Sequence, residues 1–281
     1  MKSLLIRTGS GIVLVAVMVA AILCSVETLL ALALLIAAVS IHEFLCLSFP
    51  LEKGMRGFMS HAPVIFIGWV MIFITYGVVW QGLSHWYYII LLPLPFIDMV
   101  GEISRKQSSP MRRMGSRMAA LIYIGVPMSL LVAMGALLGG TGYNAGLVLF
   151  YVILIWINDV GAYLFGITLG KHRLCERLSP KKSWEGFFGG LICTVLASVF
   201  LGPRMTGFEN TPFWVWIIFG VVLTLSAVGG DLFESMLKRE AGVKDSGNLI
   251  PGHGGFLDRF DAMLISLPFV YILLIWIAAT S

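Results

Sequence analysis

The sequence predicts an all-α, polytopic integral membrane protein with about nine transmembrane helices and a cytoplasmic amino terminus. Hydrophobic residues make up 58% of its 281 residues, charged residues make up only 12%, and the mean hydropathy is +0.93. This composition differs strongly from that of a soluble domain. The apolar residues also gather in runs close to the roughly 20 residues that a helix needs to cross a bilayer. The basic residues fall in alternate loops.

The apolar runs give the expected helices in order. They cover 8–25, 28–49, 62–80, 85–100, 118–138, 144–166, 186–202, 212–230 and 261–280. We interpret the first as a retained helix, because the residues "AIL" before Cys24 lack the small residue of a cleavage site. Two regions follow: N-terminal transmembrane helices over 1–140 and a C-terminal transmembrane catalytic region with cytoplasmic loops over 141–281. No soluble domain or internal repeat is expected.

The basic residues set the expected orientation. Of the 19 lysines and arginines, only Arg204 lies in a loop on the side opposite the others. The rest precede the first helix or lie in the even-numbered loops. The fourth loop, 101–117, contains Arg112, Arg113 and Arg117. The positive-inside rule makes that side cytoplasmic. The net charge of +4 therefore indicates anionic lipid or a phosphorylated substrate rather than nucleic acid.

The four cysteines indicate neither a disulfide framework nor a zinc site. They form no CxxC pair and fall on different expected elements. Residues that could perform chemistry concentrate instead between 158 and 261. Two further pairs near the cytoplasmic ends of the second and fourth helices are interpreted as structural or rim residues: His42 with Glu43, and Asp98 with Glu102.

The segment "DLFESMLKRE" continues the eighth helix beyond the membrane. Asp231, Glu234, Ser235 and Lys238 fall on one helical face. Carboxylates at i and i+3 can share a hard cation, and a lysine roughly 10 Å along the axis suits a polyphosphate. The alternative is a solvated helix end with an i,i+4 salt bridge between Glu234 and Lys238. Both interpretations stay open at this point.

The segment "PGHGGFLDRFD" leads into the ninth helix. Asp258 and Asp261 are spaced i,i+3 at its start, where unpaired backbone amides and the helix dipole favour an acid. Capping explains one aspartate. It explains neither Arg259 between them nor the preceding glycines, which let backbone amides approach phosphate oxygens. Because a charge at mid-bilayer costs roughly 2.5–3.5 kcal/mol, and less at the interface, such a cluster is a candidate functional site.

Two more segments supply candidates. "SPKKSWEG" carries Lys181 and Lys182, with Trp184 placed as an interfacial anchor, although a polybasic loop is more often a topology determinant. "WINDVGAYLFG" puts Asn158 and Asp159 inside the sixth helix, where polar groups need partners. Asp159 either packs between helices or lines a cavity.

These segments carry a resemblance to a known family. "SMLKREAGVKDSGNLIPGHGGFLDRFD", residues 235–261, resembles the signature of the CDP-diacylglycerol synthases, also called phosphatidate cytidylyltransferases. The matching positions are Ser235, Lys238, Arg239, Lys244, Asp245, Gly247, Pro251, His253, Gly254, Gly255, Asp258, Arg259 and Asp261. "NDVGAYLFGITLGKH" and "SPKKSWEG" also look like this family, with Ser183 where threonine is usual. Ahead of residue 158, only the helical layout and the Glu43 region match.

The resemblance implies condensation of CTP with phosphatidic acid to CDP-diacylglycerol and pyrophosphate. Together with the residue patterns, it points to a catalytic group formed by Asp231, Lys238, Asp258, Arg259 and Asp261. The expected ligands of Mg²⁺ are Asp231 and Asp258, assisted by Asp261, and a second cation stays open. The expected substrate-binding residues are Asn158, Asp159, Ser179, Lys181, Lys182, Glu234, Ser235, Arg239, Lys244, Asp245, His253, Gly254 and Gly255.

The residue types agree with this chemistry. The lipid phosphate is already ionised and needs no general base, so what the reaction requires is neutralisation of two highly negative reactants. Metal-binding carboxylates and basic residues provide it. CTP arrives from water and phosphatidic acid lies in the leaflet, which accounts for a polar segment at the membrane boundary. The expected partners are CTP, phosphatidic acid and the bilayer, with no nucleic acid, and a homodimer stays open. The expected location is the bacterial inner membrane, with the site facing the cytoplasm.

Other classes of membrane protein would require different sequence features. A cation transporter could use Asp159, Asp231 and Asp258, but the charge lies on one side and no repeat is seen. A CDP-alcohol phosphotransferase would carry a "DGxxAR" motif, and that motif is absent from the sequence. A related cytidylyltransferase that uses another phospholipid acceptor stays open.

Overall fold

A computed structural model describes residues 2–49, 54–105, 109–137, 142–205, 211–250 and 254–280. The chain divides into two compact units, Met1–Ala133 with Asp245–Arg259 and Met134–Lys244 with Phe260–Ser281. The segment after Lys244 therefore packs with the N-terminal helices, although it lies late in the sequence. The expected functional division at residue 140 stays a prediction.

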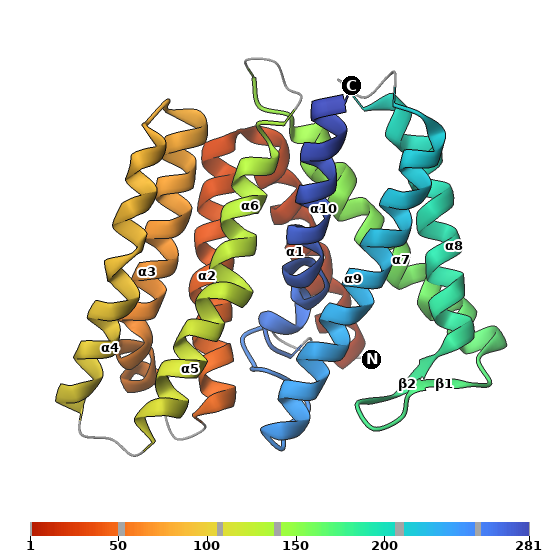
Figure 1. Cartoon of the computed structure of the whole chain (residues 1–281). Helices are drawn as coiled ribbons and strands as arrows, with labels where there is room; N and C mark the ends of the chain where they lie inside the picture. The colour runs from red at the N-terminus through yellow and green to blue at the C-terminus, as the bar shows by residue number, and fades with distance from the viewer. Residues whose placement is uncertain are drawn as a thin grey trace. The chain divides into compact units, whose positions relative to one another are not determined.

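The first unit contains the N-terminal helices (Figure 1). They are α1 (Lys2–Cys24), α2 (Val26–Ser48), α3 (Gly54–Trp80), η1 (His85–Leu91), α4 (Pro93–Arg105), α5 (Pro110–Ala120), η2 (Leu121–Gly125) and α6 (Val126–Met134), with η4 (Leu257–Arg259) from the late segment. α2 packs along α3, and Leu29, Ile36 and Ile41 are among its fully buried side chains. Ser25 caps α2 by accepting a hydrogen bond from the Thr28 amide.

The second unit contains α7 (Ala145–Leu169), β1 (Arg173–Cys175), β2 (Ser179–Ser183), α8 (Trp184–Leu201), η3 (Gly202–Arg204), α9 (Phe213–Glu240) and α10 (Asp261–Thr280). α7 and α8 lie side by side (Figure 1). Gly190 allows their close approach because it has no side chain. A Cβ at this position would lie 2.9 Å from the Asn158 carbonyl oxygen. The Tyr151 hydroxyl donates to the Met263 carbonyl oxygen at 3.0 Å and so joins α7 to α10.

The all-α, polytopic class is confirmed. Among the described residues, eight helical segments are long and apolar enough to cross a membrane, and Thr8–Cys24 is a shorter apolar helix. α9 runs to Glu240, which confirms that the eighth expected helix continues beyond residue 230. The protein is therefore a helical membrane protein.

Within the fourth predicted loop, the expectation for the arginines was wrong. α5 begins at Pro110, so Arg112, Arg113 and Arg117 lie in a helix rather than in a loop. Arg117 donates to Asp98 at 2.5 Å and Arg113 donates to Glu102 at 2.6 Å, with all four side chains at most 5% exposed. The paired carboxylates on α4 compensate the desolvation of the two guanidinium groups. The structural interpretation of Asp98 and Glu102 is confirmed.

A short hairpin replaces the loop expected between the sixth and seventh spans. β1 and β2 pair antiparallel, with Arg173 opposite Ser183 and Cys175 opposite Ser179. The sequence did not predict these strands, because Pro180 and the two lysines are typical of a loop. A two-stranded sheet leaves both strands as edges, where a proline is tolerated.

Candidate active site

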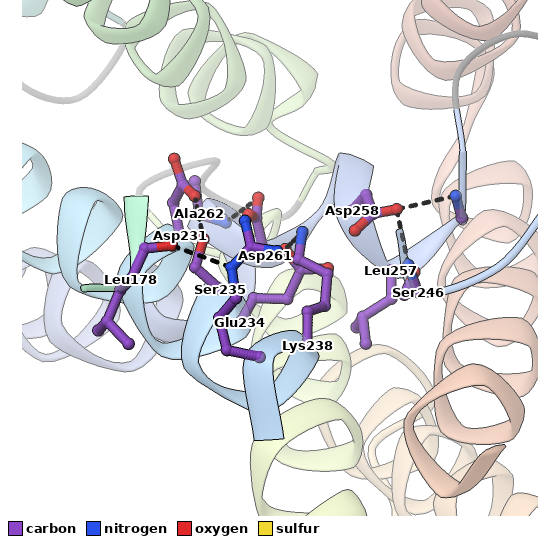
Figure 2. Close-up of polar contacts among 12 residues, drawn as sticks. Leu178, Asp231, Glu234, Ser235, Lys238, Ser246, Leu257, Asp258, Asp261 and Ala262 are labelled. Atoms are coloured by element: carbon purple, nitrogen blue, oxygen red, sulfur yellow. Dashed lines mark hydrogen bonds and ion pairs between the residues drawn. The ribbon is translucent and has the colours of Figure 1, made fainter. Parts of the chain in front are cut away.

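The C-terminal end of α9 carries a row of polar side chains in the second unit. Ser235 Oγ donates to Asp231 Oδ1 at 3.4 Å, and Lys238 Nζ lies 2.6 Å from Glu234 Oε2 (Figure 2). Glu234 is 1% exposed at its side chain, so this ion pair is largely shielded from water. The predicted common face is confirmed, and so is the salt bridge that was its alternative interpretation. These contacts alone therefore do not distinguish a cation- and phosphate-binding site from a solvated helix end with a salt bridge.

The hairpin brings a second lysine to this row. Lys182 Nζ, from β2, forms an ion pair with Asp231 Oδ2, and the two side chains are 26% and 39% exposed. Arg239 Nε donates to the Leu178 carbonyl oxygen at 3.4 Å, which joins the end of α9 to the hairpin (Figure 2). "SPKKSWEG" is therefore more than a topology signal, because one of its lysines contacts a predicted metal ligand.

Asp261 lies against the same part of α9. A Cβ at Gly230 would lie 2.5 Å from the Asp261 carbonyl oxygen, so only glycine allows α10 to begin this close to α9. The Asp261 side chain accepts a hydrogen bond from the Ala262 amide at 2.7 Å (Figure 2). It also hydrogen-bonds with Glu234 and interacts electrostatically with Asp231 and Lys238. α9 and α10 thus bring two predicted metal ligands together.

Asp159 on α7 completes the group. It interacts electrostatically with both Asp231 and Lys182. We define the carboxylate–lysine cluster as Asp159, Asp231, Glu234 and Asp261 with Lys182 and Lys238. The hydrogen bond between Asp261 and Glu234 requires one shared proton, so the four carboxyl groups carry up to three negative charges against two lysines. A cation would balance this excess. Carboxylate oxygens are the donors that Mg²⁺ prefers, so these residues fit the expected metal.

A cavity of about 380 Å³ adjoins the cluster in the second unit. Its polar lining is formed by Asn158, Asp159, Lys181, Lys182, Ser183 and Asp231. Aromatic and aliphatic side chains, including Tyr163, Ile167 and Phe187, form much of the remaining wall. The cavity therefore joins ionisable groups to an apolar surface, as an amphiphilic phosphate ester requires. Ser179, another predicted substrate-binding residue, pairs with Cys175 in the hairpin instead of lining this cavity.

The signature segment 245–259 belongs to the first unit. Asp258 Oδ2 accepts hydrogen bonds from the amides of Ser246 at 3.0 Å and Gly255 at 2.8 Å (Figure 2). Gly254 has φ +82°, which a residue with a side chain rarely adopts, and a Cβ there would lie 3.0 Å from Asp258 Oδ2. Asp258 thus closes the segment on itself, and its role as a metal ligand stays a prediction. It belongs to a different unit from Asp231 and Asp261.

Glu43 on α2 has more contacts with the signature segment than sequence reasoning expected. Its buried carboxylate accepts hydrogen bonds from the Phe256 amide at 3.0 Å, the Leu257 amide at 2.7 Å and Ser246 Oγ at 3.0 Å. A Cβ at Gly255 would lie 2.8 Å from Glu43 Oε2, so this glycine is needed for the approach. The structural interpretation of Glu43 is confirmed. Its signals in the sequence were the match of the Glu43 region to the family and the glycines of the signature.

The remaining predicted residues contribute less to these contacts. Lys181, Arg239, Lys244, Asp245 and Arg259 are exposed. Of these, Arg239 contacts the hairpin and Lys181 lines the cavity. His253 lies outside the described residues, as do the neighbouring positions 251 and 252. Gly254 and Gly255 shape the segment around Asp258 as described above.

Together, the fold and the cluster define a class: a helical membrane protein with a carboxylate-rich, lysine-containing site beside a partly apolar cavity. Residues 5–277 match the model of the family described as "Cytidylyltransferase family". This match covers more than half of the chain, and the chain belongs to that family.

Relatives with assigned names agree with this membership. The chain is 48% identical over 130 residues to the "Phosphatidate cytidylyltransferase" of Staphylococcus aureus (strain COL), which covers 46% of this chain and 48% of the relative. It is 46% identical over 130 residues to the protein of the same name in Staphylococcus epidermidis (strain ATCC 12228 / FDA PCI 1200), with the same coverage. It is 39% identical over 159 residues to that of Mycobacterium bovis (strain ATCC BAA-935 / AF2122/97), which covers 57% of this chain and 51% of the relative. The matched segments span about half the length of these relatives.

Proposed function

We propose that the protein is a phosphatidate cytidylyltransferase that condenses CTP with phosphatidic acid to CDP-diacylglycerol and pyrophosphate. Family membership and the names of the relatives support this reaction class. The observation that carries the proposal is the carboxylate–lysine cluster beside a cavity that is polar on one part of its wall and apolar on another. A soluble nucleotide and a membrane lipid require both kinds of surface.

In this reaction an oxygen of the phosphatidate phosphate attacks the α-phosphorus of CTP. The new bond joins the two phosphorus atoms through that oxygen, and the bond between the α-phosphorus and the bridging oxygen to the β-phosphate breaks. Pyrophosphate leaves with the electron pair. The nucleophile is already ionised, so none of the carboxylates needs to remove a proton. Their role is to position cations, and the lysines offset the phosphate charge.

The aspartates and the lysines have distinct roles in this scheme. Asp231 and Asp261 would hold Mg²⁺, which on binding neutralises the triphosphate and the leaving pyrophosphate, with Asp258 kept as a proposed further ligand. Lys182 pairs with Asp231, so it lies beside any phosphate that shares a cation with that carboxylate. Lys238, at the far end of the row, is suited to the other end of a phosphate chain.

We further propose that the protein lies in the bacterial inner membrane with this site facing the cytoplasm. In the loop pattern predicted from the sequence, 18 of the 19 lysines and arginines lie on one side of the expected spans, and CTP is cytoplasmic. Single cysteines introduced at Lys181 and Lys244 should react only with reagents that reach the cytoplasm. Labelling of both from outside intact cells would overturn the orientation.

The central test is turnover by the purified full-length chain in lipid nanodiscs. Release of pyrophosphate from CTP should require both phosphatidic acid and Mg²⁺. Replacing CTP with ATP, or phosphatidic acid with phosphatidylglycerol, should abolish it. Release without lipid, or none with phosphatidic acid, would contradict the proposal. Turnover with a different phosphorylated lipid only would correct the acceptor and retain the reaction.

A further inference from the structure

A second group of metal-ligating side chains lies in the first unit, on α2 and α3. His42 and Cys46 are one turn apart on α2, and His61 lies on α3. His42 Nδ1 is 3.0 Å from His61 Nδ1, and Cys46 Sγ is 3.6 Å from His42 Nε2. One donor atom from each residue lies within 4.8 Å of the others. His61 is 1% exposed, so the group is held inside the packing between the two helices.

We propose that His42, Cys46 and His61 bind a thiophilic divalent cation of the zinc class. Two imidazoles and a thiolate are soft or borderline donors, which select Zn²⁺ over the Mg²⁺ that carboxylates prefer. Zinc bonds of about 2.0–2.3 Å in a tetrahedral arrangement place such donors roughly 3.3–3.6 Å apart. The 3.0 Å contact between the two imidazoles lies near this range. The 3.6 Å contact of Cys46 is to the other nitrogen of His42, so the thiol comes within reach of the ion once the ring turns.

Binding requires one small rearrangement. The two contacts of His42 use different ring nitrogens, so the imidazole must turn until one nitrogen faces both Cys46 and His61. The ring of Phe58 packs edge-on against His42 with centroids 5.3 Å apart, so this contact must adjust as the imidazole turns. Three protein ligands leave the fourth position of a tetrahedral ion for water or another ligand.

The simpler interpretation is a hydrogen-bonded histidine pair with a cysteine packed beside it. That arrangement explains the 3.0 Å contact between the imidazoles. It does not require the thiol of Cys46, which lies one helical turn away and contacts the other nitrogen of His42. A metal site requires such a third donor. The sequence did not predict the group because its ligands come from two helices and include only one cysteine.

The test uses the full-length protein, freed of metal by a chelator and then titrated with Zn²⁺ or Co²⁺ in excess Mg²⁺. The wild type should retain about one Zn²⁺ per chain after gel filtration. Its Co²⁺ form should show thiolate-to-cobalt charge-transfer absorption. Cys46→Ser should remove this absorption, and both Cys46→Ser and His61→Gln should weaken Zn²⁺ binding by about tenfold or more. Cys193→Ser, at a half-buried cysteine of α8, is the matched control and should retain both signals.

Several outcomes would overturn the proposal. If the Co²⁺ form of the wild type lacks thiolate-to-cobalt absorption, the proposal is wrong, and this result does not depend on whether the variants fold. Zn²⁺ retention that Cys46→Ser and His61→Gln leave unchanged would assign the ion to other residues. None of these measurements uses turnover, so their result is independent of the proposed reaction.

Discussion

Two clusters of charged side chains in this membrane protein contain similar residue types in different proportions. On α4 and α5, two carboxylates meet two arginines, and every side chain is at most 5% exposed. The carboxylate–lysine cluster has four carboxylates and two lysines, and the Lys182–Asp231 pair is 26% and 39% exposed. The first cluster is balanced and shielded, which suits a structural role. The second has excess negative charge and access from solvent, which suits the binding of a cation and phosphates.

The largest expected effect is on turnover in the carboxylate–lysine cluster. Asp231→Asn should lower kcat/KM by about 1,000-fold, which corresponds to about 4 kcal/mol in activation free energy. Under the proposal that Asp258 is a further ligand of the same ion, Asp258→Asn should do the same. The double variant should then be hardly worse than either single one, because ligands of one ion act as a unit. Glu240→Gln, at the exposed end of α9, is the control. Substantial activity with an unchanged Mg²⁺ requirement in either single variant would remove that residue from the metal site.

The next effect is on stability in the balanced cluster. Arg117→Ala leaves the Asp98 carboxylate buried without its guanidinium and should cost about 3 kcal/mol. The measurement is a lower Tm in detergent, with turnover per folded molecule kept within a few-fold of wild type. Arg112→Ala, an exposed arginine on the same helix, should change the Tm little. An unchanged Tm in Arg117→Ala would show that the pair adds no stability.

A smaller effect is expected when a phosphate-facing cation is removed. Lys182→Ala should lower kcat/KM by about 10–100-fold, because Lys182 offsets phosphate charge beside Asp231. The structure itself should persist, since a partly exposed ion pair adds little stability. Lys171→Ala, an exposed lysine ahead of the hairpin, provides the comparison. Equal activity in the two variants would return the hairpin lysines to a topological role.

The sequence predicted the features that depend on local pattern. Apolar runs located the spanning helices, and the i,i+4 spacing located the Glu234–Lys238 pair. It failed where a partner is distant in the chain. Arg117 suggested a loop because nothing nearby in the sequence indicates that Asp98 would bury with it, and the strand at Ser179–Ser183 needs its pairing with β1.

Glu43 is the extreme case of such a distant partner. Its contact with Ser246 joins residues 203 positions apart, and its contacts with the Phe256 and Leu257 amides are longer still in sequence. Neither Glu43 nor the segment 246–257, considered alone, shows why a carboxylate should be buried on α2. Only the folded segment supplies the three donors that satisfy it.

The last prediction concerns this carboxylate. Glu43→Gln keeps the size of the side chain but replaces one accepting oxygen with an amide that can only donate. Because the lost acceptor faces donors of the signature segment, we expect a loss of about 1–2 kcal/mol in stability. We also expect a several-fold fall in kcat with a higher Mg²⁺ optimum, since Glu43 positions the segment that carries Asp258. Glu27→Gln changes the same residue type on the same helix at an exposed position and should be nearly silent. If Glu43→Gln lowers the Tm and leaves kcat and the Mg²⁺ optimum at their wild-type values, Glu43 stabilises the first unit without positioning the segment for catalysis.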